Sequence, residues 1–359
     1  MHTEDQPVSA EAPGRIEILG NHTDYNEGVV LAAAVDCTVR VRGSVRSDGR
    51  ILLTSTSYPP VEIAISQLLP QPGELRWANC PLGVASELLV AGISTRGFSA
   101  TIESDLPDGI GLGSSAALAV ATACFLLKLN ECELPPLELA KICQRSEHRF
   151  TGVQSGLLDQ VTSIFAEAGQ LIFFDCRTEE VRTISFPDDL ALVVADSGTK
   201  RQLARSEYNQ RREQTRAVAQ ALGVRALRDI VPAQLNAHVD LAPLLRRRAA
   251  HIIVENERVW RACDLLAHGD AAGLGELMNE SHESSRINFE NSTAELDHLV
   301  DLARKQPGVL GARLTGAGFG GAIVALCENG SAEEAAHNLA SAAALTFICR
   351  PADGALARN

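Results

Sequence analysis

The stretch Leu106–Ala117 constrains the fold most strongly, because three glycines and two serines stand directly before an Ala-rich apolar run that continues to Leu129. Glycines let a backbone approach a ligand closely, and the first turn of a helix presents free amides to an anion. We therefore expect a phosphate-binding loop that is neither the Walker pattern nor the dinucleotide fingerprint. The alternative interpretation is a buried helix with a flexible entry. The expected loop residues are Gly109, Ile110, Gly111, Leu112, Gly113, Ser114 and Ser115.

A second informative stretch runs from Arg15 to Gly28, where an apolar segment ends at Gly20 and a run of polar residues follows. Such a pattern predicts a strand that enters a turn, with the polar side chains at the strand end. His22, Asp24 and Asn26 provide both donors and acceptors, as a polyhydroxylated ligand such as a sugar requires. The competing interpretation is a solvated turn.

Composition limits the partners. The chain has 359 residues, enough for one large domain or two ordinary ones, and 45% of them are hydrophobic. Its formal net charge of -13 argues against nucleic acid or an anionic membrane as the main partner. A phosphate ligand must then be held by local devices such as backbone amides, a metal ion or a few arginines.

Cysteine usage and the N-terminal stretch indicate the compartment. The nine cysteines include no Cys-x-x-Cys pair, which makes a disulfide framework or a zinc cluster improbable and favours a reducing compartment. The polar, acidic stretch Met1–Glu11 does not resemble a signal peptide, and the apolar run Ala116–Leu127 is too short to span a bilayer. We expect a soluble cytoplasmic protein.

The distribution of strands and helices predicts two domains. Short apolar runs with turn residues between them predict a mixed sheet before Asp188, whereas long helical patterns dominate after it. The boundary is therefore placed at residue 188, giving a domain of residues 1–188 and a domain of residues 189–359. The helices expected in the second domain are Ser206–Leu222, Ala249–Leu266, Asp270–Ser284 and Ala294–Arg304.

Three motifs carry a resemblance to a known family. The residues Ala12–Arg15 and Gly20–Gly28 resemble the signature of galactokinases, which share a kinase superfamily with homoserine, mevalonate and phosphomevalonate kinases. Pro107–Ala116 resembles the nucleotide loop of that superfamily, and Leu314–Gly321 resembles its third motif. Two departures are visible: Asn21 stands where galactokinases carry Glu, and Gly113 stands where they usually carry Ser.

The resemblance implies a two-domain α+β fold with the active site in the cleft between the domains. It implies transfer of the ATP γ-phosphoryl group to the C1 hydroxyl of α-D-galactose, with residues 109–115 around the triphosphate. Ser115 and Glu147 are the implied Mg²⁺ ligands, hard oxygens of the kind this ion prefers. The implied substrate-binding residues are Asn21, His22, Thr23, Asp24, Gly156 and Tyr208.

The implied catalytic residues are Asp159, beside the C1 hydroxyl, and Arg15, which stabilises the developing anion. Whether Asp159 acts as a base or only positions the hydroxyl stays open, because the proton can leave late in a loose transition state. The expected partners are a sugar and ATP, with no nucleic acid and no membrane, and the chain is expected to be a monomer or a weak dimer.

Two alternatives remain. One is a non-catalytic sugar sensor, against which the intact Ser114-Ser115-Ala116 run argues. The other is a kinase for another small molecule, such as mevalonate or D-galacturonate. In galactokinases the Glu at position 21 accepts a hydrogen bond from the C6 hydroxyl and repels acidic sugars, so Asn21 predicts a side activity on galacturonate.

Overall fold

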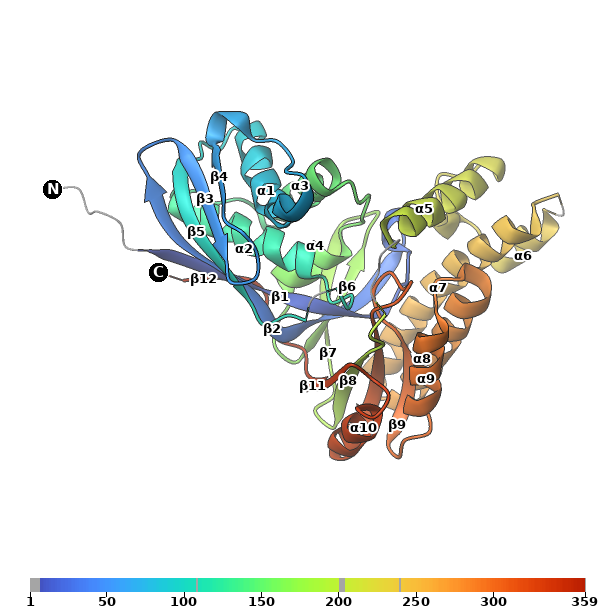
Figure 1. The fold of residues 1–359 in the computed structure, drawn as a ribbon. Helices are drawn as coiled ribbons and strands as arrows, with labels where there is room; N and C mark the ends of the chain where they lie inside the picture. Colours follow the sequence, from blue (N-terminus) through green and yellow to red (C-terminus); the bar gives the residue numbers. More distant parts are fainter. Residues whose placement is uncertain (1–6, 108, 200–203, 239, 359) are drawn as a thin grey trace.

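The computed structural model describes residues 7–107, 109–199, 204–238 and 240–358. Figure 1 shows two halves that diverge from a common base formed by the long strands β1 and β2. The N-terminal half carries a large sheet covered by helices, and the C-terminal half carries a smaller sheet and a group of helices.

The larger sheet has the strand order β12-β1-β2-β5-β3-β4, and β6 and β7 extend it from β2. Every pair is antiparallel except β3 with β5. The apolar run 29–35 of β2 is buried throughout, as expected for a strand covered on both faces. The strands are β1 (Val8–Leu19), β2 (Val29–Arg46), β3 (Arg50–Ser55), β4 (Val61–Ala64), β5 (Gly97–Ser104), β6 (Gln170–Asp175), β7 (Glu180–Ser185) and β12 (Leu356–Arg358).

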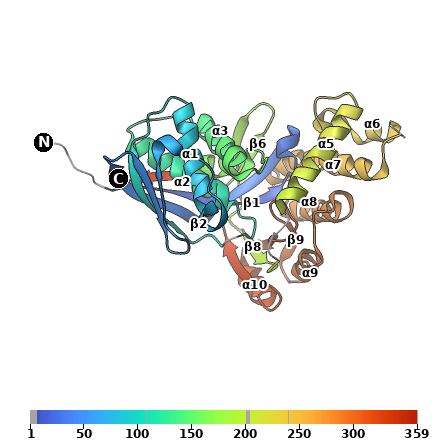
Figure 2. The same ribbon diagram turned by 45° about the horizontal axis from the view of Figure 1, so that its top comes forward.

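Four helices gather beside this sheet (Figures 1 and 2): α1 (Asn79–Val90), α2 (Ser114–Leu129), α3 (Pro136–Ser146) and α4 (Leu158–Phe165). The Ala-rich helix α2 is apolar on nearly all sides and contacts β1, β2 and the other three helices. A helix without a polar face must be buried, so α2 forms the centre of this half and its first residue is fixed beside β1.

The smaller sheet is antiparallel, with the order β11-β8-β10-β9. Its strands are β8 (Leu190–Asp196), β9 (Val309–Leu314), β10 (Ala322–Glu328) and β11 (Leu345–Cys349). The helices of this half are α5 (Ala204–Ala221), α6 (Pro232–Ala237), α7 (Pro243–Ala267), α8 (Ala271–Ser284), α9 (Ala294–Ala303) and α10 (Ala332–Leu339). The long helix α7 begins before the expected residue 249, because Pro243 is well suited to the first turn of a helix.

Short helical turns connect these elements. Two of them are single π-helical turns that directly continue α3 and α8, namely η4 (Glu147–Thr151) and η6 (Ser285–Phe289). Such turns re-aim the residues that follow a helix, and they occur often at functional sites. The others are η1 (Asp24–Asn26), η2 (Ile65–Gln67), η3 (Gly73–Ala78), η5 (Leu227–Asp229) and η7 (Asn329–Ser331).

The division of the chain between the sheets differs in one respect from the predicted domains. The chain leaves the larger sheet at Ser185 and enters the smaller one at Leu190, on either side of the predicted boundary at residue 188. However, β12 returns to pair with β1, with Ser9 opposite Arg358 and Glu11 opposite Leu356. The range 189–359 therefore does not form a separate unit, because its last strand completes the N-terminal sheet.

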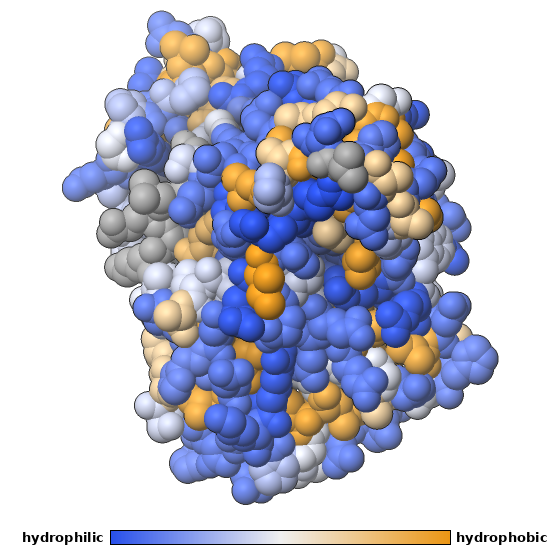
Figure 3. All heavy atoms as spheres, turned by 90° about the vertical axis from the view of Figure 1, so that its right-hand side faces the viewer, coloured by the Kyte–Doolittle hydropathy of each residue, from blue (hydrophilic) through white to orange (hydrophobic). Residues whose placement is uncertain are grey.

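The surface of the C-terminal half is mainly hydrophilic on the face drawn in Figure 3, where hydrophobic residues occur as separate spots. Within the described ranges, no helix has the length and apolar character needed to cross a bilayer.

Candidate active site

A cavity of about 600 Å³ lies where the two halves meet, and residues of both halves line it. Of the residues predicted for the site, most contribute atoms to its wall: Arg15, Asn21, His22, Asp24, Gly109, Gly111, Gly113, Ser114, Ser115, Glu147, Gly156, Asp159 and Tyr208. They converge here from β1, the turn after it, the loop before α2, the start of α2, η4, the start of α4 with the residues just before it, and α5. Three predicted residues do not line the cavity, namely Thr23, Ile110 and Leu112.

Arg15 and Asp159 form a two-pronged ion pair in this cavity. Arg15 Nε donates to Asp159 Oδ1 at 2.7 Å, and Nη2 donates to Oδ2 at 2.8 Å. Arg15 Nη1 also donates to the carbonyl of Gly111 at 2.5 Å, which ties the pair to the glycine loop. The Arg15 side chain is nearly buried, whereas 29% of the Asp159 side chain is exposed. The fixed guanidinium thus presents the carboxylate to the cavity in one orientation.

The loop before α2 has the geometry of an anion cradle. Gly109, Gly111 and Gly113 adopt φ values of 77°, 92° and 71°, which side-chain-bearing residues rarely adopt. Between them, Ile110 and Leu112 turn their side chains into the core, so only their backbone groups can meet a ligand. The helix starts at Ser114, and its free amides face the same space as the Ser114 and Ser115 atoms that line the cavity.

Glu147 and Ser115 bring two oxygen donors together beside this loop. Glu147 lies on the π-helical turn η4, and its Oε2 accepts from Ser155 Oγ at 2.5 Å and from Gln160 Nε2 at 3.3 Å. Burial raises the pKa of Glu147, and hydrogen bonds from Ser155 and Ser115 oppose that effect. The described residues contain no cluster of three His, Cys, Asp or Glu side chains that could hold a metal alone. A carboxylate and a hydroxyl are hard oxygen ligands, and this pair suits an ion such as Mg²⁺ that takes its remaining ligands from water and phosphate.

Asp24 is a buried carboxylate on the opposite wall. Burial, reinforced by the nearby charges of Asp159 and Glu17, raises its pKa to about 7. A Cβ at Gly156 would lie only 2.1 Å from Asp24 Oδ2, so no larger residue fits at position 156 without moving this carboxylate. Tyr208, from α5, also lines this part of the cavity. This region thus combines acceptors with an aromatic ring, a combination suited to a polyol.

His22 uses both ring nitrogens within the protein. Burial lowers its pKa to about 3, so the ring is neutral. Nε2 lies 2.9 Å from the carbonyl of Ala317 and must carry the proton, because a carbonyl can only accept. Nδ1 then accepts from the Tyr25 hydroxyl at 2.7 Å. The predicted substrate-binding role of His22 is therefore limited to ring contact, because neither nitrogen is left for a sugar hydroxyl.

Thr23 does not face the cavity, contrary to the prediction that it binds substrate. Its hydroxyl lies 2.7 Å from the carbonyl oxygens of both Gly20 and Val29, and the residue is fully buried. The hydroxyl closes the turn between β1 and β2, and a Cβ at Gly28 would lie 2.6 Å from Thr23 Cβ. Thr23 is therefore a packing residue of the turn.

Asn21 lines the cavity, but its amide is fully engaged. Nδ2 donates to Glu17 Oε1 and to the carbonyl of Gly316, each at 2.8 Å. Oδ1 accepts from Asn291 Nδ2 at 2.8 Å and from Ser285 Oγ at 3.4 Å. An amide has two donor hydrogens and two acceptor sites, so no capacity remains for a sugar hydroxyl. The structure thus removes the expected basis for C6 recognition by Asn21.

Residues at two further places line a cavity, although no sequence motif marks them. Glu17 lines the cavity but stands inside an apolar strand, where its only signal is a charge two positions after Arg15. Tyr58 and Trp77 stack at 5.8 Å between ring centroids, beside a second cavity of about 320 Å³ that also reaches Ser114 and Ser115. Aromatic residues make up only 4% of the chain, so the presence of Tyr58 and Trp77 before α1 is the sequence signal that could have indicated this place.

Comparisons with known proteins agree with this geometry. The model of the GHMP kinases N-terminal domain matches residues 79–167, that of the GHMP kinases C-terminal region matches residues 262–345, and the galactokinase galactose-binding signature matches residues 2–45. The galactokinase of Roseiflexus sp. (strain RS-1) is 40% identical over 97% of this chain and 92% of its own length. Human galactokinase is 38% identical over 97% of this chain and 91% of its own length.

Solved structures give the same result. The galactokinase of Lactococcus lactis, solved in complex with galactose, superposes with a TM-score of 0.94 at 31% identity, covering 98% of this chain and 95% of that one. The mevalonate kinase of Methanococcus jannaschii, at 18% identity and a TM-score of 0.71, shares the fold. The predicted two-domain α+β kinase fold is thus confirmed, and the chain belongs to the galactokinase family of the GHMP kinases.

Proposed function

We propose that the protein is a galactokinase that transfers the γ-phosphoryl group of ATP to the C1 hydroxyl of α-D-galactose, giving α-D-galactose 1-phosphate and ADP. The observation that carries the proposal is the Arg15–Asp159 ion pair held directly beneath the glycine loop. It places a group that can orient a hydroxyl next to a cradle for a triphosphate. The relatives named galactokinase and the galactose-bound structure support galactose as the acceptor.

In the proposed reaction, the C1 oxygen attacks the γ-phosphorus, the bond to the β,γ-bridging oxygen breaks, and ADP leaves. The C1 proton passes to Asp159, whose partly exposed carboxylate faces the cavity. Arg15 holds both carboxylate oxygens and carries the positive charge that stabilises the developing anion. Phosphoryl transfer depends mainly on positioning and charge, which is what this fixed pair provides.

The loop Gly109–Ser115 would hold the triphosphate through backbone amides and the first turn of α2. Ser115 and Glu147 would hold Mg²⁺, which neutralises phosphate charge when it is bound. Beyond the serines, the cavity beside Tyr58 and Trp77 would take the nucleobase, since two stacked rings offer an apolar, flat surface.

We further infer that the enzyme is a monomer or a weak dimer and works in the cytoplasm. All nine cysteines are free, which supports a reducing compartment such as the cytoplasm. The net charge of -13 argues against nucleic acid as a partner.

The test is a coupled assay of ADP formation by the purified protein with ATP and Mg²⁺, using D-galactose, D-glucose, D-galacturonate and mevalonate. We expect galactose to have the highest kcat/KM, with α-D-galactose 1-phosphate identified by phosphorus NMR. Galactose binding without ADP formation would indicate a sensor. A higher kcat/KM for galacturonate or mevalonate than for galactose would reject the proposed substrate.

A further inference from the structure

Glu17 is a buried carboxylate in the active-site cavity with no role so far. It lies on β1 two residues after Arg15, and both residues line the cavity, so they share one face of the strand. Two residues of strand advance the chain by about 6.6 Å, which is comparable with the breadth of a hexopyranose ring. A sugar whose C1 hydroxyl meets the Arg15–Asp159 pair therefore presents its opposite edge to Glu17.

The contacts of Glu17 leave one oxygen available. Oε1 accepts from Asn21 Nδ2 at 2.8 Å and from Arg313 Nη2 at 3.0 Å. No donor among the described residues reaches Oε2. Arg313 is itself fully buried and donates to the carbonyl of Ile18 at 2.9 Å, which fixes it against β1. Glu17 is thus held from one side and offers an acceptor to the cavity from the other.

We propose that Glu17 is a specificity-determining residue: its Oε2 accepts a hydrogen bond from a hydroxyl on the sugar edge opposite C1, and its charge excludes sugars that carry a carboxylate. This inference rests on the proposed function. Asn21 cannot take this role because its amide is saturated by protein partners. Asn21 therefore orients the carboxylate of Glu17, and Glu17 contacts the sugar.

The charges around the cavity support exclusion of acidic sugars. Asp24, Asp159 and Glu17 all line it, and the guanidinium of Arg15 is already paired with Asp159. Ionised carboxylates only accept hydrogen bonds, so they suit the hydroxyl donors of a neutral sugar, and burial raises the pKa of both Glu17 and Asp24 because this space disfavours negative charge. A uronate would place another negative charge in this buried space, where like charges repel strongly.

The experiment compares Glu17→Gln with the wild type, because the amide keeps the shape of the side chain and removes its charge. For galactose we expect KM to rise about 10-fold or more with a smaller change in kcat, as for loss of a hydrogen bond to a charged group. The ratio of kcat/KM for galactose to that for galacturonate should fall by at least about 10-fold. An unchanged ratio in a folded variant would overturn the proposal.

Arg313→Gln is the matched control, since it breaks the same buried ion pair and leaves the Glu17 carboxylate in place. We expect this variant to lose stability and keep the sugar preference. If it shifts the ratio as much as Glu17→Gln does, the effect comes from the lost ion pair and the proposal is wrong. Should Glu17→Gln fail to fold, Glu17→Gln/Arg313→Gln compared with Arg313→Gln isolates the carboxylate, because neither variant contains the ion pair.

A panel of deoxygalactoses identifies the hydroxyl. For the analogue that lacks the hydroxyl bound by Glu17, the wild type and Glu17→Gln should have similar KM values, whereas for the others they should differ. If Glu17→Gln weakens every analogue equally, no single hydroxyl is recognised and the proposal fails. Calorimetric binding of galactose without ATP keeps this result separate from catalysis: a wild type that binds galactose but forms no ADP contradicts the proposed function alone.

Discussion

The turn at residues 20–28 and the loop at residues 109–115 border the same cavity, yet most of their polar groups point in opposite directions. In the turn, the side chains of Asn21, His22 and Thr23 direct their hydrogen-bonding groups into the protein. In the loop, three glycines and the start of α2 leave backbone amides and two serines facing the cavity. The hydrogen-bonding groups of these three turn residues are used within the protein, whereas those of the loop are available to a ligand.

The turn is hydrogen-bonded to α7 of the C-terminal half. Glu255 Oε1, on α7, accepts from the backbone amides of Gly20 at 3.1 Å and Asn21 at 3.2 Å. His251 Nε2 lies 3.1 Å from the carbonyl of Asn21. Burial raises the pKa of Glu255, but the charges of Arg258 and Arg313 outweigh burial and lower this pKa to about 2. The carboxylate therefore stays ionised. The polar groups of Asn21, His22 and Thr23 thus hold the two halves together, whereas Asp24 is the residue of the turn that faces the ligand space.

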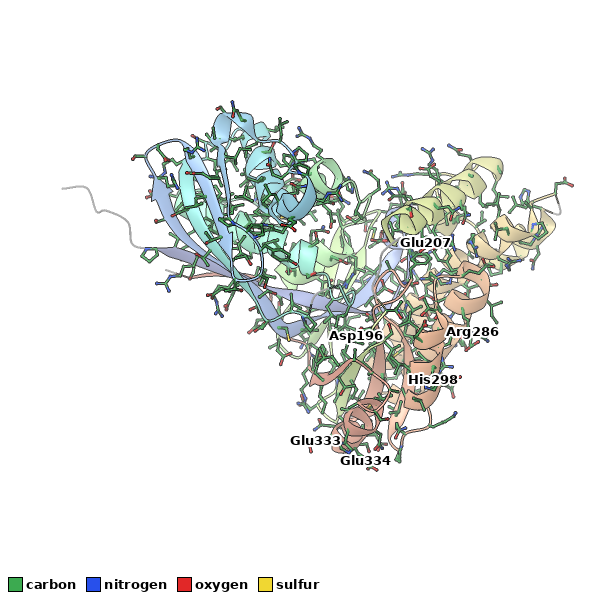
Figure 4. All side chains as sticks on the ribbon, in the orientation of Figure 1. Asp196, Glu207, Arg286, His298, Glu333 and Glu334 are labelled. Atoms are coloured by element: carbon green, nitrogen blue, oxygen red, sulfur yellow. The ribbon has the colours of Figure 1, made fainter. Side chains whose placement is uncertain are left out.

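The largest expected effect is the loss of kcat when Asp159, beside the glycine loop, is replaced. Replacing Asp159 with Ala should lower kcat by roughly 10²–10⁴, as for loss of an aligned acid–base group. Galactose affinity should change little, whereas the thermal midpoint should fall because the nearly buried Arg15 loses its partner. The control is Glu334→Gln, which removes a carboxylate from α10 at the far end of the C-terminal half (Figure 4). A variant that keeps more than about a tenth of the wild-type kcat would contradict the assignment of Asp159.

The substitution Asn21→Glu tests whether the hydrogen bonds of Asn21 stabilise the turn. This change removes the donors to Glu17 and Gly316 and places a second carboxylate beside Glu17. The free energy of unfolding should fall by about 3 kcal/mol, because a buried charge is left unpaired. Urea unfolding measures it, and Asn338→Glu at an exposed position is the control. A loss below about 0.5 kcal/mol, typical of surface sites, would show that the turn tolerates charge.

A pH series tests the joint between the turn and α7. Burial lowers the pKa of His251 to about 4 from its ordinary value of 6.5, so its contribution to stability is present above pH 6.5 and is lost as the pH falls toward 4. At pH 5 the loss should be about 2 kcal/mol. Asp24, with its raised pKa, acts in the opposite direction.

The pH measurement is therefore a difference between the wild type and His251→Gln, in which the contribution of Asp24 cancels. Between pH 7 and pH 5, the wild type should lose about 2 kcal/mol more unfolding free energy than the variant. Parallel curves for the two proteins would show that His251 is not held neutral in the fold.

The metal side of the loop gives a smaller effect. Ser115→Ala and Glu147→Gln should each raise the half-saturating Mg²⁺ concentration about 10-fold, because each removes one proposed oxygen ligand. Ser114→Ala, at the neighbouring serine, should leave the Mg²⁺ requirement unchanged. Titration of activity with Mg²⁺ at fixed ATP is the measurement. The same half-saturating concentration in both variants and the wild type would assign these residues a structural role only.

The smallest expected effect lies at the nucleobase end. Tyr58→Ala removes one of the stacked rings, which is worth about 1 kcal/mol and should raise the KM for ATP about 5-fold. The KM for galactose should stay constant. Trp260→Ala is the control, since Trp260 is also a partly exposed aromatic residue and packs against Phe173 on another surface. An equal rise in KM for ATP in both variants would contradict the proposed site.

The sequence alone predicted the parts of the site that depend on local chemistry. Glycine permits backbone angles that other residues avoid, and three glycines just before a helical run indicate a tight loop, so this loop could be inferred from its own residues. The orientation of Asn21 could not, because its partners Asn291 and Gly316 are distant in the chain. The same holds for Glu17, which becomes visible only when β1 turns it to the face of Arg15 and Arg313 closes over it.

The return of β12 to the edge of β1 has a consequence for biosynthesis. Domains generally fold as units during synthesis, starting from the N-terminus. Here the strand that carries Arg15 and Glu17 keeps an open edge until residues 356–358 have left the ribosome. The first half of the chain therefore cannot finish its own sheet, and the enzyme reaches its final form only after translation of the whole described chain.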